Sequence, residues 1–84
     1  MEKYLKRLCR AILSGRFNDE KYTQRKSWNG KDIQAMPLFC SYGLIGFIVI
    51  VYYDDSRQFH ITWDREMRNL AINGTNWEEY INNL

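Results

Sequence analysis

Cationic and aromatic side chains alternate in the part of the chain before residue 32. The members of this set are Lys3, Arg7, Arg10, Lys21, Tyr22, Arg25, Lys26, Trp28 and Lys31. Lysine and arginine bind carboxylates and phosphates, while exposed tyrosine and tryptophan anchor protein interfaces or stack on nucleic-acid bases. We therefore expect these nine residues to form one exposed partner-binding surface.

The distribution of charge along the chain favours an acidic partner. The formal net charge is only +2 at pH 7. Residues 1–31 hold nine basic and three acidic residues, a net of +6, whereas residues 32–84 hold three basic and seven acidic residues, a net of −4. Such a split steers an acidic macromolecule toward one side of a folded domain.

A catalytic interpretation would begin at His60, the one histidine of the chain. Thr62 and Asp64 share its face of a predicted strand, and Ser56 is close in sequence, so a Ser, His and Asp arrangement is conceivable. Alternate residues of a strand stand roughly 7 Å apart, a spacing that suits cross-strand pairing equally well. An exposed strand histidine is the simpler interpretation, and we expect no enzymatic activity.

Metal-binding and redox patterns are also missing from the sequence. The two cysteines, Cys9 and Cys40, form no Cys-x-x-Cys pair, and Asp54 and Asp55 lack the ligand spacing of a calcium loop. We expect no metal and no cofactor. Two reduced, mostly buried thiols are the leading interpretation, with a disulfide between them as the alternative.

The chain begins with a pattern typical of a basic amphipathic helix. Its apolar side chains recur with helical spacing at Tyr4, Leu5, Leu8, Cys9, Ile12 and Leu13, and Gly15 favours a helix end. Such a helix can lie on an anionic bilayer, but a domain of 84 residues needs the apolar face to cover its sheet. We expect no membrane contact. Four basic residues among the first ten argue against a secretory signal, so we expect a cytoplasmic protein.

The middle of the chain favours antiparallel strands. Asn29-Gly30 is a hairpin-turn signal, and residues 32–41 form a strand that Pro37 confines to an edge or breaks. Residues 44–53 are apolar on both alternating faces, which predicts a central strand covered on both sides. This segment is too short for a membrane helix. After a turn at residues 54–57, alternation of apolar and polar residues predicts another strand through Trp63.

The end of the chain favours helix. Asp64 is a candidate N-cap for a short helix with Met67, Leu70 and Ala71 on its apolar face, which would end at Asn73-Gly74. Thr75 and Glu78 match a capping box for a last helix. The fold class is therefore α+β in a single domain of residues 1–84, with an N-terminal helix, a three- to four-stranded antiparallel meander, and one or two C-terminal helices.

These patterns together predict a small non-enzymatic binding protein. We expect a regulator or inhibitor of the phage or mobile-element accessory type, which docks its basic and aromatic surface on an acidic macromolecule. A protein is the leading expectation for the partner, and RNA or DNA bound by the same residues is the alternative. The sequence leaves the oligomeric state open.

Overall fold

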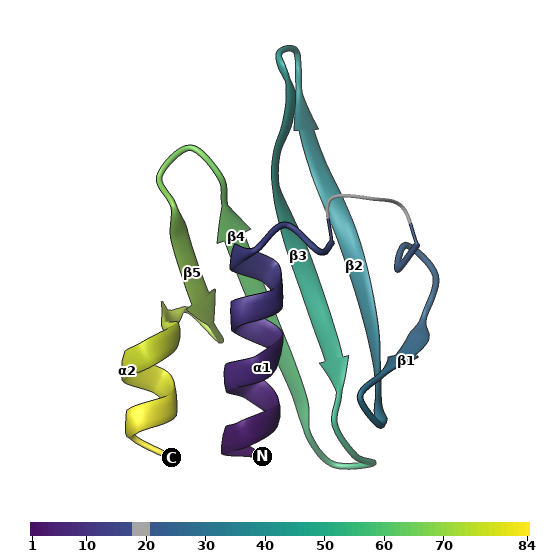
Figure 1. Ribbon diagram of the computed structural model, residues 1–84, viewed down its shortest axis with the longest axis vertical. Helices are drawn as coiled ribbons and strands as arrows, with labels where there is room; N and C mark the ends of the chain where they lie inside the picture. The colour runs from purple at the N-terminus through teal and green to yellow at the C-terminus, as the bar shows by residue number, and fades with distance from the viewer. Residues whose placement is uncertain (18–20) are drawn as a thin grey trace.

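Two helices pack against a twisted antiparallel sheet (Figure 1). The computed structural model describes residues 1–17 and 21–84. Within them the elements are α1 (Glu2–Leu13), β1 (Lys26–Trp28), β2 (Lys31–Cys40), β3 (Gly43–Tyr52), β4 (Gln58–Asp64), β5 (Asn69–Ile72), β6 (Thr75–Asn76) and α2 (Trp77–Asn82). The strands are neighbours in the order of the sequence, from β1 to β6, and each runs antiparallel to the next.

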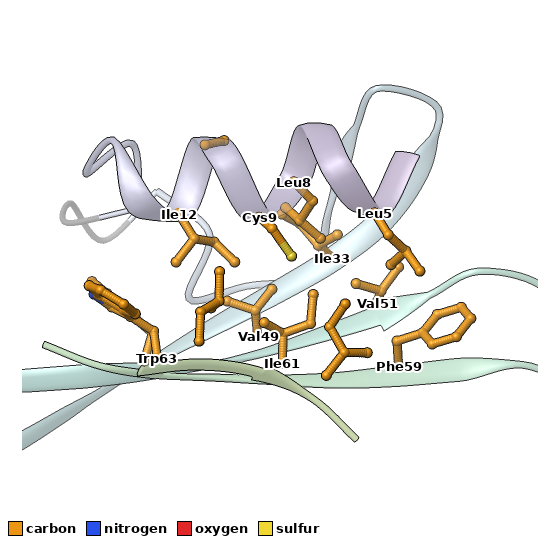
Figure 2. Packing of buried hydrophobic residues seen from close by; sticks show 14 of the residues in the cluster. Leu5, Leu8, Cys9, Ile12, Ile33, Val49, Val51, Phe59, Ile61 and Trp63 are labelled. Carbon is orange, nitrogen blue, oxygen red and sulfur yellow. The ribbon is translucent and has the colours of Figure 1, made fainter. Parts of the chain in front are cut away.

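The core lies between α1 and one face of the sheet (Figure 2). Leu5, Leu8, Cys9 and Ile12 of α1 are almost completely buried, as the helical spacing of these apolar residues predicts. Beneath them lie alternate residues of β2, β3, β4 and β5, which are Ile33, Ala35, Phe47, Val49, Val51, Phe59, Ile61, Trp63, Leu70 and Ile72. Ile81 of α2 joins the same cluster, so both helices cover the same side of the sheet.

The other side of the sheet is the open face. The register of the strands places on it Asp32, Gln34, Met36, Leu38, Ile48, Ile50, Tyr52, Gln58, His60, Thr62, Asp64, Asn69 and Ala71. None of these residues belongs to the buried cluster. The expectation that β3 is covered on both sides is therefore wrong for the described chain, because Ile48 and Ile50 lie half-buried on the open face.

The hairpin between β1 and β2 confirms the turn predicted at Asn29-Gly30. Asn29 has φ 49° and Gly30 has φ 92°, and Trp28 pairs with Lys31 across the turn. Both central residues of a type I′ turn need positive φ, which asparagine and glycine tolerate. Strand β1 itself contains only three residues, and residues 18–20 of the preceding basic segment lie outside the described residues.

Pro37 lies in the part of β2 that extends beyond β1. Strand β1 pairs only with residues 31–33 of β2. Farther along β2, the backbone N–H of Ala35 donates to the carbonyl oxygen of Tyr22 at 2.7 Å. Backbone groups alternate between the two edges of a strand, so the nitrogen of Pro37 faces the same outer edge as that of Ala35. None of the described strands pairs with this outer edge at Pro37. The missing N–H therefore costs no ladder hydrogen bond, which confirms the expectation of an edge.

The sheet has more strands than the three or four that the sequence predicts. The short helix expected after Asp64 is wrong: residues 65–68 form a turn, with Arg68 at φ 50°, and β5 follows. The Asp64 carboxylate does accept a hydrogen bond from the Met67 N–H at 3.0 Å, but it stabilises this turn. Leu70 is buried because β5 pairs with β4, which satisfies backbone groups and apolar side chains together.

The last helix begins one residue later than the predicted capping box. The Asn76 Oδ1 atom accepts hydrogen bonds from the N–H groups of Glu78 and Glu79, at 3.1 and 3.3 Å. Asn76 is therefore the N-cap, and the prediction of Thr75 in that role is wrong because Thr75 pairs with Ile72 in the β5–β6 ladder. Neither described helix has both the length and the apolar character needed to cross a bilayer.

Candidate functional site

A cationic cleft runs beside the exposed face of α1. This open depression of about 500 Å³ is lined by Arg7, Arg10, Ala11, Ser14, Arg16, Trp28 and Asn29. One wall comes from α1 and the residues that end it, and the other comes from the β1–β2 turn. We define these seven residues as the cationic cleft.

The end of α1 brings the third arginine to the cleft. Gly15 has φ 85°, and its N–H donates to the carbonyl oxygen of Ile12 at 3.1 Å. The N–H of Arg16 donates to the carbonyl oxygen of Ala11, also at 3.1 Å. This pair of bonds is a Schellman motif, which requires a left-handed residue after the C-cap and reverses the chain direction. Arg16 thus returns toward Arg10 of the last helical turn instead of continuing away from it.

The aromatic wall of the cleft is held by packing on its inner side. The Tyr4 hydroxyl donates to the carbonyl oxygen of Trp28 at 3.0 Å, and the two rings meet edge to face with centroids 5.6 Å apart. The ring centroid of Phe17 lies 6.1 Å from that of Trp28. The indole is half-buried as a result, so it offers the cleft a fixed surface.

Among the described residues, no carboxylate is paired with the positive charges of the cleft. None of its lining residues is acidic. Within residues 1–17 and 21–84, the ion pairs are Lys6–Glu2, Arg25–Asp32 and Arg57–Asp54, and none involves an arginine of the cleft. Three guanidinium groups around one hollow attract an anion and offer planar, bidentate hydrogen bonds to carboxylate or phosphate.

Several residues of the predicted surface gather at or near the cleft. Arg7, Arg10 and Trp28 line it, and Lys3 lies one helical turn before Arg7 on α1. Lys26 and Lys31 share the helix-covered side of the sheet with Trp28, since Lys31 pairs directly with Trp28 and Lys26 with Ile33. The ammonium group of Lys31 lies 4.2 Å from the centre of the Tyr53 ring.

Other members of the predicted surface lie elsewhere. The Cζ atom of Arg25 lies 3.8 Å from the centre of the Tyr52 ring, and its Nε atom lies 3.1 Å from the Asp32 carboxylate. Because Tyr52 and Asp32 are on the open face, Arg25 belongs to that face as well. Tyr22 is half-buried against Phe17, with ring centroids 5.1 Å apart, and the Lys21 ammonium lies 5.5 Å from the Tyr22 ring centre. The nine predicted residues thus divide between two sides of the molecule.

Sequence reasoning missed Arg16, Ser14 and Asn29 as lining residues. The sequence shows that Arg16 is basic, but its position beside the cleft depends on the chain reversal at Gly15. A glycine two residues after the last apolar position of a helix, followed directly by arginine, is the signal that could have identified it.

The structure does not assemble a catalytic set around His60. The Ser56 hydroxyl donates to Asp54 at 3.1 Å in the β3–β4 turn, and Asp64 accepts from Met67. His60 lies exposed on the open face opposite Ile50. Among the described residues, no three His, Cys, Asp or Glu side chains are grouped to hold a metal ion.

The two cysteines differ in environment. Cys9 is buried on the sheet-facing side of α1, and burial raises the pKa of its thiol to about 12. Cys40 is exposed at the end of β2, so the prediction of a mostly buried thiol is wrong there because the β2–β3 hairpin projects beyond the helices (Figure 1). Both thiols are free.

Comparison with known proteins adds no relative: no protein-family model matches the chain, and no curated protein or solved structure matches it significantly.

Proposed function

We propose that this protein is a small non-enzymatic regulator or inhibitor that docks its cationic cleft on an acidic surface of another protein. The observation that carries the proposal is the grouping of Arg7, Arg10 and Arg16 around one hollow without a carboxylate among its lining residues. Carboxylate side chains of a partner would complete the hydrogen bonds of these guanidinium groups. Such a protein acts by covering a surface of its partner, which requires no catalytic residue.

A protein partner fits the aromatic side chains better than a nucleic acid does. Proteins that bind single strands without sequence preference stack bases on exposed ring faces. Here Trp28 packs against Tyr4 and Phe17, and Tyr22 packs against Phe17, so both rings already contribute to the core. A half-buried tryptophan beside several arginines instead resembles an interface anchor with charged neighbours.

The proposal is tested by affinity capture from cells of the native host. The immobilised parent protein is compared with Arg7→Gln/Arg10→Gln, which removes two charges from the cleft and keeps good helix formers in α1. The matched control is Arg65→Gln/Arg68→Gln, which removes two charges from the β4–β5 turn. Each sample is divided, and one half is treated with nuclease.

The expected result is a protein that the parent and the control retain after nuclease treatment, while the cleft variant loses at least about 90% of it. Loss of about 1.4 kcal/mol of binding free energy corresponds to a tenfold weaker complex, which two charge-assisted hydrogen bonds readily supply. Equal retention by all three proteins would contradict the proposal. Loss of the partner on nuclease treatment, with steep salt dependence, would instead favour nucleic acid.

A further inference from the structure

Two Asn-Gly turns of the chain have nearly the same backbone geometry. Asn29-Gly30 joins β1 to β2 with φ 49° and 92°, and Asn73-Gly74 joins β5 to β6 with φ 49° and 86°. In each hairpin the residues on either side of the dipeptide pair with one another across the turn. The two turns thus form a matched pair, and what distinguishes them is the surroundings of the asparagine side chain.

The side chain of Asn73 is held by neighbouring elements. Its Oδ1 atom accepts a hydrogen bond from the N–H of His60 at 2.9 Å, and its Nδ2 atom donates to the Tyr80 hydroxyl at 3.5 Å. The backbone N–H of Asn73 donates to the carbonyl oxygen of His60 at 2.8 Å. This side chain therefore leaves its position only when the turn detaches from β4 and α2, which requires local unfolding.

The side chain of Asn29 has no such restraint. It is exposed at the rim of the cationic cleft, and within residues 1–17 and 21–84 it makes no hydrogen bond. An added Cβ atom at Gly30 would find nothing within 4 Å, so the backbone after Asn29 is open to water. The turn also follows a strand of three residues at the edge of the sheet. The Asn29 side chain is therefore able to rotate toward the backbone nitrogen of Gly30.

An asparagine that precedes glycine loses its side-chain nitrogen without an enzyme when the two groups meet. The glycine nitrogen attacks the asparagine Cγ atom and gives up its proton, the bond from Cγ to Nδ2 breaks, and Nδ2 leaves as ammonia. Water then opens the cyclic imide at either carbonyl group, which gives aspartate or isoaspartate. Glycine favours ring closure because it has no Cβ atom. The reaction consumes water and releases ammonia, so it needs no oxidant or reductant.

From these observations we propose that Asn29-Gly30 is a site of spontaneous deamidation, which places a carboxylate in the cationic cleft and closes it to acidic partners. Both products carry their negative charge at the hollow that Arg7, Arg10 and Arg16 also line. The new carboxylate competes with those of a partner for the same guanidinium groups. The loss of binding rests on the proposed function of the cleft, whereas the chemical step does not.

The chemical step is tested by incubating the folded protein near neutral pH. Trypsin releases the two sites in separate peptides, Ser27–Lys31 and Asn69–Leu84. Chromatography and fragment-ion mass spectrometry measure the aspartate and isoaspartate formed at Asn29 and at Asn73. The control is the same protein in concentrated guanidinium chloride, because the unfolded chain contains neither turn.

In the folded protein, Asn29 is expected to convert about tenfold faster than Asn73, a ratio that the hydrogen bonds of Asn73 readily supply. In the unfolded protein, the two rates are expected to be similar. Equal rates at the two sites of the folded protein would overturn the proposal. So would a folded protein in which Asn29 stays intact for the time that converts it fully in the unfolded chain.

The position of the new charge is tested without a partner, in the variant Asn29→Asp. NMR titration of the added carboxyl group is expected to give a pKa below the ordinary aspartate value of about 3.9, because the guanidinium groups stabilise the charged form. Adding Arg7→Gln/Arg10→Gln should raise that pKa again. An unchanged pKa in the combined variant would show that the carboxylate does not meet these arginines, which overturns the proposal.

The effect on binding is measured with a synthetic glutamate peptide, which represents an acidic surface. Asn29→Asp is expected to bind it at least tenfold more weakly than Gln58→Glu, a ratio of about 1.4 kcal/mol. Gln58→Glu adds the same charge at an exposed position of the open face. Equal binding by the two variants would overturn the proposed closure of the cleft. A parent that fails to bind the peptide would contradict the proposed function instead, and the deamidation rates and the carboxyl pKa would still decide this inference.

Discussion

Replacing Gly46 with alanine should destabilise the protein although alanine is ordinarily better than glycine in a strand. Gly46 pairs with Leu38 on one side and Asp64 on the other, beside the β-bulge at residues 38 and 39. A Cβ atom at this position would lie 1.9 Å from the carbonyl oxygen of Trp63 and 3.1 Å from its carbonyl carbon. Ordinary contact begins at 3.4 Å, so the two backbones would have to separate by about 1.5 Å.

The magnitude follows from three contributions. Overpacking in a close-packed site costs about 1–3 kcal/mol. Separation of β3 from β4 would also stretch the neighbouring hydrogen bond from the Arg65 N–H to the carbonyl oxygen of Ile45, now 2.8 Å long, at about 0.5–1.5 kcal/mol. Alanine offsets about 0.5–1 kcal/mol of this cost, because its backbone loses less conformational entropy on folding than that of glycine. The midpoints of these ranges give a net loss of about 2 kcal/mol of unfolding free energy, which corresponds to a melting temperature lower by roughly 8–16 °C.

The measurement is urea unfolding followed by tryptophan fluorescence, with all proteins at one concentration. Gly30→Ala is the control, since Gly30 has φ +92° but nothing within 4 Å of its added Cβ. That variant isolates the cost of a left-handed backbone, about 1 kcal/mol. If Gly46→Ala is as stable as the parent, or more stable, the close approach of the two strands is not the reason for glycine at this position.

Two further predictions concern the last helix and alkaline pH. Asn76→Ala should lower the unfolding free energy by about 1 kcal/mol because two capping hydrogen bonds are lost, whereas Thr75→Ala should cost clearly less, as urea unfolding of both variants will measure. Burial raises the pKa of the Cys9 thiol from 9.0 to about 12 and, together with the charge of Asp32, raises that of the Tyr4 hydroxyl. Above about pH 9 the unfolded chain therefore holds fewer protons than the folded chain, so unfolding free energy should fall as pH rises toward 12, and Cys9→Ala should reduce that slope.

The sequence predicted those elements whose signals are local and redundant. Helix α1 has both an apolar stripe and a glycine at its end, and the Asn29-Gly30 turn has few alternative conformations. The region of Leu70 and Ala71 has four residues between turns, too few to separate a helical from a strand period. There the pairing with β4 decides the outcome, and that pairing is not visible in the local pattern.

The candidate site was only partly predictable for a related reason. Composition identifies the cations before residue 32, but the side of the molecule on which each one lies depends on strand register. Lys26 and Trp28 stand on the helix-covered side, whereas Arg25, one residue before β1, turns to the open face and stacks on Tyr52. A shift of one residue exchanges the two faces of a strand, so a sequence without known register cannot assign them.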